Sequence, residues 1–398
     1  MFLYFSLLYI ASLFNAKARL LVSGQKTTLS KLKQIVKSTD HWVWFHAASV
    51  GEFEQGRPLI ERYRQLYPGR RILLTFFSPS GYEMRKDYQG VDLVAYLPFA
   101  TRRNARRMLQ ILPLEEVFFI KYEFWPAYLR ALKKASIKTY LVSAIFHPKQ
   151  AFFRWWGGWY RKLLHCFTYL FVQDEASRTL LADYGIHNVE VAGDTRFDRV
   201  NEICSVRNHI PQMECFVEDG LPVIVAGSTW PADEVLLARF LQEHADVKLV
   251  VVPHEINEEH LHQIFQFFDG RYVRFSQATS NSLRHTKCLL IDNLGMLSQL
   301  YRYATVTYVG GGFGVGIHNL IEAAVYGKPV VFGPNYKSFR EAHRLIEEGG
   351  GFTISNYIEL CGVLESQLTD STSAGIAAGR YVQSELGATE KILNKIKN

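Results

Sequence analysis

The segment YVGGGFGVGIHNLIEAAVYGKPVVF, residues 308–332, decides the fold class of this chain. It contains an apolar run, a loop with five glycines, a helical pattern and a second apolar run, in that order. This alternation predicts two parallel strands joined by a helix. Glycines before a helix let backbone N–H groups approach an anion, and Asn319 or His318 could cap that helix. The loop is therefore either a phosphate site or a turn that needs glycine only for its geometry.

Two known phosphate motifs are excluded in this segment. The third glycine of Gly-x-Gly-x-x-Gly is missing in every register, so the dinucleotide fingerprint is absent. Gly327-Lys328 is followed by Pro329 and not by Ser or Thr, so a Walker A loop is also absent. Glu322 lies one turn into the helix, where its carboxylate either holds ribose hydroxyls or is an ordinary exposed side chain.

The composition indicates two domains without a metal or a cofactor. The chain has 398 residues, 48% of them hydrophobic, which is enough for two cores of ordinary size. Its five cysteines are scattered and never in Cys-x-x-Cys spacing, which favours a reducing compartment and argues against structural zinc. His254-Glu255 resembles the start of a zinc-protease motif, but Glu258 stands where the second histidine is required.

The net charge of +7 is distributed unevenly. Residues 1–200 hold 29 Lys and Arg against 16 Asp and Glu, whereas the remainder holds 16 against 22. A basic first half predicts contact with an anionic surface or substrate.

The N-terminus predicts which surface this is. Residues 2–14 are uncharged and rich in Leu, Phe and Tyr, and six basic residues follow before the first acid. We expect residues 1–22 to be a membrane anchor, either spanning the bilayer or lying in its interface. Ala16-Lys17-Ala18 resembles a signal-peptidase site, but no basic residue precedes the apolar run as a signal peptide requires. The positive-inside rule then keeps the body of the protein cytoplasmic.

Two carboxylates follow buried strands in the first half. Glu52 comes shortly after the apolar run 42–46, and Glu123 comes after 117–120. Because the carboxyl ends of parallel strands meet at one edge, both acids are candidates for a catalytic site. Ser49-x-x-Glu52 is also a capping box, which would explain both residues structurally.

Two further segments of the first half allow more than one interpretation. Arg102 and Arg106 share one helix face and Arg103 and Arg107 the adjoining one, which suits either solvent or lipid phosphates. The aromatic cluster at residues 152–160 is either core or the lining of a groove for acyl chains.

The second half repeats the strand and helix pattern. Residues 201–221 lose periodicity and contain the linker, so we expect domains at residues 23–205 and 206–398. The C-terminal helix could pack back on the first domain. Ser228 and Thr229 end a strand before Pro231, where a hydroxyl could cap the next helix and leave its end open to an anion. Two doubly wound α/β halves with a cleft between them and a Gly-rich loop in the second predict a GT-B-like glycosyltransferase.

Four motifs carry a resemblance to a known family. In chain order they are HAASVGE (46–52), YEFWP (122–126), GDTRFD (193–198) and HNLIE (318–322). With the N-terminal anchor, they resemble the 3-deoxy-D-manno-octulosonic acid (Kdo) transferases of lipopolysaccharide synthesis. The resemblance implies an inverting transfer of Kdo from CMP-Kdo to the lipid A precursor lipid IVA. It also implies the cytoplasmic face of the inner membrane as the location, and no nucleic acid or metal as partner.

The resemblance also implies roles for individual residues. Glu52 matches the general base, and Glu123 and Arg196 match positions that stabilise the transition state. Residues expected to contact CMP are Ser228, Thr229, Pro253, His254, Leu294, Gly295, Met296, Asn319, Leu320, Ile321 and Glu322.

The chain departs from the family pattern at two of these positions. Arg196 stands in Asp-Thr-Arg-Phe-Asp where many members have Asn-Leu-Lys-Phe-Asp, which keeps the charge but changes its geometry. His254 replaces an arginine that is common in relatives after the proline. Two alternatives stay open: another GT-B enzyme with a UDP-sugar and a lipid-linked acceptor, and a membrane-tethered nucleotide-binding protein without activity.

Overall fold

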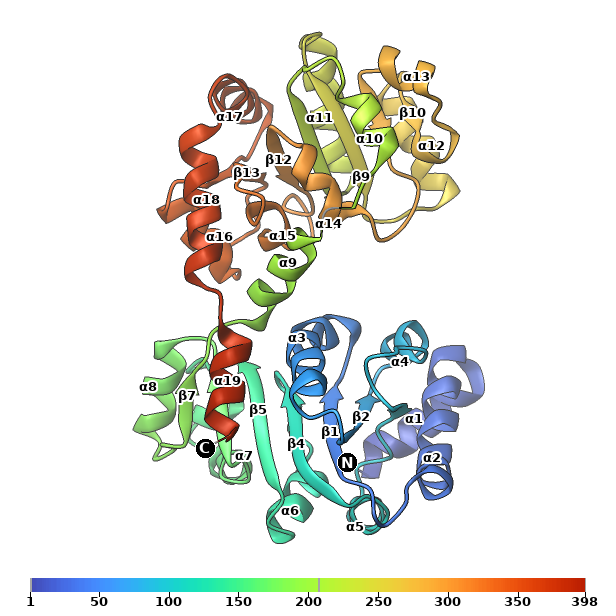
Figure 1. Cartoon of the computed structure of the whole chain (residues 1–398), viewed down its shortest axis with the longest axis vertical. Coiled ribbons are helices and arrows are strands. Elements are labelled where there is room, and N and C mark those ends of the chain that lie inside the picture. The colour runs from blue at the N-terminus through green and yellow to red at the C-terminus, as the bar shows by residue number, and fades with distance from the viewer. Residues whose placement is uncertain (1, 207, 398) are drawn as a thin grey trace. The chain divides into compact units, whose positions relative to one another are not determined.

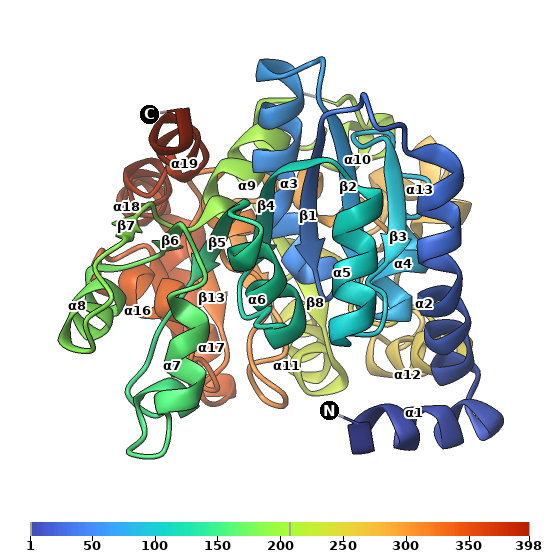
Figure 2. The same ribbon diagram turned by 90° about the horizontal axis from the view of Figure 1, so that it is seen from below.

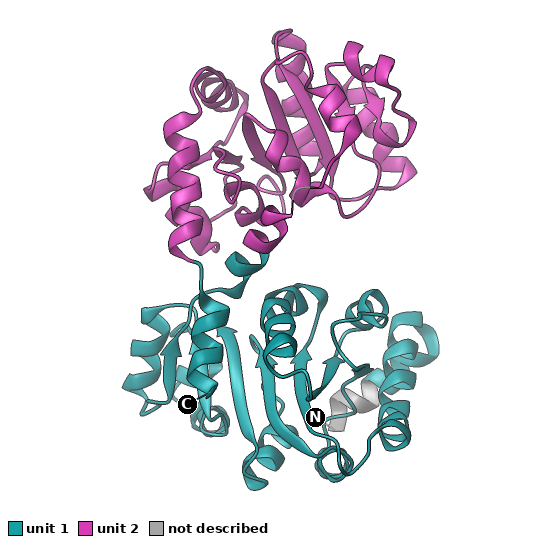
Figure 3. Cartoon of the chain, viewed as in Figure 1, with its two compact units in different colours: residues 1–199, 386–398 teal, residues 200–385 magenta. Residues whose placement is uncertain are grey.

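The computed structural model describes residues 2–206 and 208–397, which form two compact units. Unit 1 contains residues 1–199 together with the C-terminal residues 386–398, and unit 2 contains residues 200–385 (Figure 3). The last helix therefore belongs to the unit that is formed by the first half of the chain. Each unit is a parallel sheet covered by helices, so the predicted α/β class is confirmed.

Unit 1 is built around a parallel sheet that has seven strands in the part of the chain described. Its strand order is β3-β2-β1-β4-β5-β6-β7, and Figure 1 shows the strands side by side. The strands are β1 (Trp42–Ala47), β2 (Arg71–Phe76), β3 (Leu93–Tyr96), β4 (Leu114–Ile120), β5 (Lys138–Ala144), β6 (Tyr169–Val172) and β7 (Val189–Val191). The helices are α1 (Phe2–Phe14), α2 (Ala16–Ile35), α3 (Val50–Leu66), α4 (Pro79–Arg85), α5 (Arg102–Ile111), α6 (Pro126–Lys134), the short η1 (Ala151–Phe153), α7 (Gly158–Leu164), α8 (Glu175–Asp183) and α19 (Ala388–Lys397). A further helix, α9 (Thr195–Ser205), begins in unit 1 and continues into unit 2.

Alternate residues of β1 pack on opposite faces of this sheet, as the strand geometry requires. Trp42 and Trp44 join the core beneath α2, α5, α6 and α7. Val43 and Phe45 join the core beneath α3 and α19. Figure 2 shows these two sets of helices on opposite sides of the sheet. The strand is buried along its whole length because both faces are covered, which explains its continuous apolar sequence.

Unit 2 repeats this architecture with the order β10-β11-β9-β8-β12-β13-β14. The strands are β8 (Val223–Thr229), β9 (Lys248–Pro253), β10 (Val273–Arg274), β11 (Cys288–Leu290), β12 (Val306–Val309), β13 (Val330–Phe332) and β14 (Gly351–Thr353). The helices are α10 (Pro211–Phe216), α11 (Pro231–Glu243), α12 (Glu258–Phe267), η2 (Phe275–Gln277), α13 (Ser280–His285), α14 (Leu297–Leu300), η3 (Tyr301–Tyr303), α15 (Ile321–Ala324), α16 (Arg340–Glu347), α17 (Tyr357–Thr369) and α18 (Thr372–Ser384). One face of the sheet packs against α11, α12 and α17.

The N-terminal segment differs from the predicted anchor of residues 1–22. The chain changes direction at Asn15, whose side chain accepts a hydrogen bond from the Ala18 N–H and starts α2. Leu21 and Val22 are buried, and Thr28 Oγ1 donates to the Tyr96 carbonyl, so α2 packs on the sheet. Within residues 2–206 and 208–397, no helix combines the length and the apolar character that crossing a membrane requires.

Close packing explains some of the glycines in the loop after β12. A Cβ atom on Gly312 would lie 2.6 Å from the Cα of Gly333, and one on Gly310 would lie 2.4 Å from the Ser228 carbonyl oxygen. Two backbone segments therefore pass one another here at a distance that only glycine permits. A Cβ atom on Gly314, in contrast, would have its nearest neighbour at 3.9 Å.

This difference predicts unequal effects of two alanine substitutions in one loop. We expect Gly312→Ala to destabilise the protein by about 1–3 kcal/mol, because the backbone of the 333 region must move. Gly314→Ala should change stability by less than about 0.5 kcal/mol. Urea unfolding followed by circular dichroism measures both, and equal effects of the two variants would contradict the packing explanation.

Candidate active site

The candidate site of unit 1 lies where the winding of the sheet reverses. β1 is followed outward by β2 and β3 on one side, and β4 begins the series on its other side. In such sheets ligands bind at the carboxyl ends of the two central strands. Glu52 follows β1 and Glu123 follows β4, so the structure brings both predicted acids to this edge.

Glu52 is part of the first turn of α3, where its carboxylate is half-buried. Ser49 caps this helix and accepts the Glu52 N–H at 3.4 Å, and the Glu52 carboxylate accepts the Ala48 N–H. Ser49 therefore caps the helix as the capping-box interpretation predicts. The Glu52 carboxylate does not complete the box, because it accepts the N–H of Ala48. Burial raises the pKa of Glu52, and the neighbouring Glu123 raises it further. A carboxylate with a raised pKa is suited to accept a proton near neutral pH.

Glu123 is held by two aromatic side chains. Trp125 Nε1–H donates to Glu123 Oε2 at 2.6 Å, and His46 Nε2 lies 2.9 Å from the same oxygen. His46 is fully buried in β1, and its Nδ1 lies 2.8 Å from the hydroxyl of Thr75 on β2. This network fixes the Glu123 carboxylate, and an imidazole beside it can offset its charge.

Arg196 at the start of α9 is held by a buried carboxylate. Its Nε and Nη2 donate to Asp194 Oδ2 at 2.8 and 2.7 Å, and its backbone N–H donates to Asp194 Oδ1 at 2.9 Å. The neighbouring Thr195 hydroxyl donates to the Gln55 carbonyl on α3, one turn after Glu52. Arg196 and Glu52 are thus both positioned through α3, and the Arg196 guanidinium is partly exposed.

Two residues at this edge have a strained backbone. Lys121 follows β4 with φ 57°, and Ser143 near the end of β5 also has φ 57°. Left-handed conformations in residues other than glycine cost of order 1 kcal/mol or more and occur often at functional sites. The positive charge of Lys121 also acts on Glu52 and opposes the rise of its pKa.

The candidate site of unit 2 lies at the equivalent reversal, between β8 and β12. Asp233 of α11 is fully buried there and accepts three hydrogen bonds, from the Trp230 N–H, the Gly311 N–H and the Tyr308 hydroxyl. The N–H of Gly311 is therefore used within the protein. The helix after the glycine loop, α15, has only four residues, and Asn319 Oδ1 accepts its Ile321 N–H. The geometric interpretation of the loop thus explains Gly310, Gly311 and Gly312, and a phosphate contact elsewhere in the loop stays a prediction.

The residues predicted to contact CMP come from four loops at this edge. Ser228 and Thr229 end β8, Pro253 and His254 follow β9, Leu294 to Met296 follow β11, and Asn319 to Glu322 open α15. The N-cap residue of α11 is Trp230, so the expectation that a hydroxyl caps this helix was wrong, and Thr229 Oγ1 donates to Glu234 Oε1 at 2.8 Å instead. The side chains of Leu320 and Ile321 are fully buried, so only their backbones can reach a ligand. Leu294 is 83% exposed, and Asn319 donates to Glu322 Oε1 at 2.8 Å.

The structure adds residues to both sites that sequence reasoning did not select. They are His46, Trp125 and Asp194 in unit 1, and Trp230 and Asp233 in unit 2. His318, which the sequence suggested only as a helix cap, accepts the Trp230 Nε1–H and stacks on His254. His46 could have been selected from the sequence, because a histidine inside a buried apolar strand needs a polar partner. Trp230 and Trp125 each directly precede a helix-starting proline, which placed them at the strand ends. Among the described residues, no group of three His, Cys, Asp or Glu side chains is arranged to hold a metal ion.

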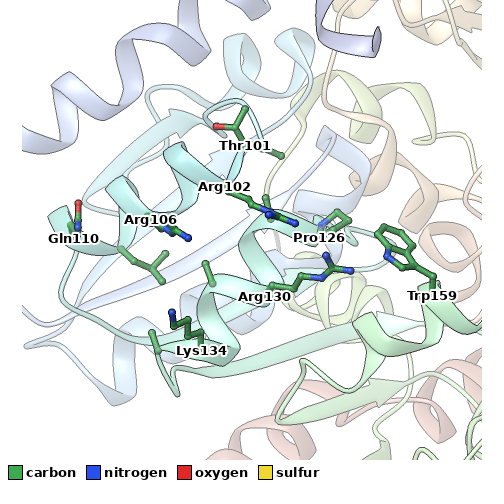
Figure 4. A pocket seen from close by; sticks show the side chains of 13 residues that line it. Thr101, Arg102, Arg106, Gln110, Pro126, Arg130, Lys134 and Trp159 are labelled. Atoms are coloured by element: carbon green, nitrogen blue, oxygen red, sulfur yellow. The ribbon is translucent and has the colours of Figure 1, made fainter. Parts of the chain in front are cut away.

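Unit 1 also has a large groove between α5 and α6, with a volume of about 1190 Å³. Its cationic side chains are Arg102, Arg106, Arg130 and Lys134, and no acidic side chain is among the described residues that line it. Figure 4 shows Arg130 between Pro126 and Trp159, whose ring it approaches at 5.1 Å. The apolar lining consists of Ala100, Leu109, Pro126, Ala127, Ala131, Ala135 and Trp159. Trp155 and Trp156, in the segment before α7, are 93% and 51% exposed.

Comparisons with known proteins agree with the motifs. Residues 19–199 match the family described as 3-deoxy-D-manno-octulosonic-acid transferase (kdotransferase). The 3-deoxy-D-manno-octulosonic acid transferase of Aquifex aeolicus is 26% identical over 350 residues, which are 85% of this chain and 89% of that protein. The enzyme of the same name from Chlamydia trachomatis serovar A is 25% identical over 348 residues, 84% of this chain and 80% of that protein.

Solved structures of known proteins show the same fold. The UDP-GlcNAc 2-epimerase of Neisseria meningitidis matches 90% of this chain and 100% of its own with a TM-score of 0.61 at 14% identity. A glycosyltransferase from Rickettsia africae matches 91% of this chain and 98% of its own with a TM-score of 0.58, also at 14% identity. These likenesses confirm the GT-B-like arrangement of each sheet and its helices. The match of residues 19–199 identifies a Kdo transferase domain in this protein, and the four motifs and the relatives that span most of the chain support its activity as a glycosyltransferase.

Proposed function

We propose that this protein transfers Kdo from CMP-Kdo to the lipid A precursor lipid IVA, with inversion, at the cytoplasmic face of the inner membrane. The observation that carries the proposal is the Glu52 carboxylate, half-buried at the β1–β4 reversal with a raised pKa beside Glu123. A base of this kind is what an inverting transfer to a hydroxyl group needs. The relatives with this name support the choice of Kdo as the transferred sugar.

The residues of unit 1 suit the acceptor side of the reaction. Glu52 takes the proton of the acceptor hydroxyl as its oxygen bonds to the anomeric carbon of Kdo. The bond from that carbon to the phosphate oxygen breaks, and CMP leaves with the electron pair. Glu123 and the partly exposed Arg196 provide fixed charges for the oxocarbenium character and the leaving phosphate, respectively. One displacement at the carbon inverts its configuration.

The groove between α5 and α6 suits an acceptor that carries both acyl chains and phosphates. Four cations surround its apolar lining, and Pro126 directly follows Trp125, which holds Glu123. A phosphate on Arg102 or Arg130 and an acyl chain along the alanines would bring a sugar hydroxyl toward the end of the groove at Pro126. The exposed tryptophans and α1, which has Leu13 and Phe14 at 66% and 86% exposed, support contact with a membrane interface.

A transfer assay tests the proposed function. Detergent-solubilised protein is incubated with lipid IVA and CMP-Kdo made in situ, and products are identified by mass spectrometry. We expect a product heavier by one or more Kdo units. Turnover with a UDP-sugar and no product with CMP-Kdo would support the alternative donor class. No turnover with any of these donors, in the presence of an active control enzyme, would support a binding protein.

Glu52→Gln tests the proposed base. We expect the rate of transfer to fall by about a hundred- to ten-thousand-fold, because amide nitrogen and oxygen cannot accept the hydroxyl proton. Glu54→Gln, an exchange on the same helix at a residue that pairs with Arg85, is the matched control and should keep the activity. Full activity of Glu52→Gln would contradict the proposed role of Glu52 as the base, but it would not affect the similarity to the Kdo transferases.

The same variant tests the pKa of Glu52 through stability. Because the folded state raises this pKa above its ordinary value of 4.5, stability from the neutral carboxyl is present at low pH and is lost as pH rises through the folded pKa. A glutamine at position 52 does not titrate in this range, so the variant does not lose stability in this way. We therefore expect Glu52→Gln to gain stability relative to wild type between about pH 5 and pH 8, measured by urea unfolding. A constant difference across this range would contradict the raised pKa.

Charge reversal tests the groove. Arg106→Glu changes the local charge by two, which at about 1 kcal/mol per charge should raise the KM for lipid IVA by about thirtyfold. Arg103→Glu is the matched control, since Arg103 is exposed on the same helix and does not line the groove. An equal effect of the two substitutions would assign the loss to net charge alone.

A further inference from the structure

Three aromatic rings from three different strand ends stack at the candidate site of unit 2. Trp230 follows β8, His254 follows β9, and His318 lies in the loop after β12. The His254 ring centroid lies 4.9 Å from that of Trp230 and 4.3 Å from that of His318, with interplanar angles of 23° and 27°. The stack therefore connects the three loops that also contain most of the predicted donor contacts.

His318 is held in its neutral form. Trp230 Nε1–H donates to His318 Nε2 at 3.0 Å, so this nitrogen must carry a lone pair. Burial lowers the pKa of His318 to about 4, and the neighbouring His254 lowers it further. At neutral pH His318 is consequently an uncharged support for the ring stacked on it.

His254 is the exposed member of the stack. Its backbone N–H donates to the Thr229 carbonyl at 3.0 Å, which fixes the loop, while its ring is open to solvent. A cation at this position would lie near the face of an indole, which is a favourable contact. The stack can therefore accommodate a positive charge on the His254 ring, but a second charge on His318 would repel it.

The acidic groups on the elements that pack around His254 are engaged elsewhere or point outward. On the β8–α11 segment, Asp233 binds Gly311, Trp230 and Tyr308, and Glu234 binds Thr229 and His260. The glycine loop between Gly310 and His318 has no charged residue. On its own loop the nearest acids are Glu255 and Glu258, both exposed.

We propose that His254 is a proton-dependent contact for the anionic part of the donor: it takes up a proton as the anion binds, and neutral His318 and Trp230 hold its ring in place. This inference rests on the proposed function, since it assigns the anion to a cytidine phosphodiester. An imidazolium N–H then donates to a phosphate oxygen. The charge of this contact depends on pH, whereas that of an arginine would not.

Binding of cytidine 5′-methylphosphate tests the inference, because this diester has a constant charge of −1 across the pH range used. Isothermal titration calorimetry at pH 6 and pH 8, in two buffers with different heats of ionisation, gives the affinity and the protons taken up. We expect an affinity about ten- to thirtyfold higher at pH 6 than at pH 8, and uptake of up to one proton on binding.

Three variants identify the residue. His254→Arg should bind at both pH values with no proton uptake, and His254→Gln should bind weakly at both. His262→Gln, an exchange of an exposed histidine on α12, should behave as wild type. Binding by wild type without proton uptake, or uptake that persists in His254→Arg, overturns the role of His254 and leaves the proposed function intact. No binding of the cytidine diester at either pH overturns the proposed donor, and this inference with it.

Discussion

The winding of the two parallel sheets determines where every functional side chain of this protein lies. Right-handed crossovers lead from β1 outward to β3, and the chain then returns to place β4 on the other side of β1. The loops after β1 and β4 therefore diverge, and helices cannot close the edge between them. Unit 2 has the same reversal between β8 and β12. The residues that follow these four strands therefore gather at one edge of each sheet.

Buried charge at these edges is compensated in a consistent way. Asp233 accepts three hydrogen bonds, Asp194 pairs with Arg196, and Glu123 contacts both His46 and Trp125. A buried carboxylate that lost its partners would cost several kcal/mol, so each of these acids fixes the loops that satisfy it. Glu52 differs from them, because the charge of Glu123 adds to its burial and raises its pKa, although the Ala48 N–H, His46 and Lys121 act in the opposite direction. A carboxylate placed beside a second carboxylate in this way is suited to accept a proton.

The sequence predicted the elements that bury continuous apolar runs and missed those that do not. β1, β4 and β9 have such runs, since helices cover both faces of the sheet. β10 and β14 are short edge strands of two and three residues, with too few residues for a period to be recognised. The segment predicted as an anchor is divided at Asn15, because a local cap ends the apolar helix after 13 residues and starts α2. Glu52 and Glu123 were found from strand ends alone, whereas His46, Asp233 and His318 act through partners distant in sequence, which only the fold brings together.

The histidines of the two sites show how the same side chain is directed to different tasks by its neighbours. His46 in unit 1 is fully buried between a threonine and a carboxylate, and an imidazole there can share the charge of Glu123. His318 in unit 2 faces an indole N–H and a second imidazole, and both favour its neutral form. His254 stacks on both Trp230 and His318 and is the exposed member of the stack, so it is the one that an arriving anion can reach. A permanent cation at this position would attract an anion at any pH, whereas the charge of an imidazole depends both on pH and on the ligand beside it.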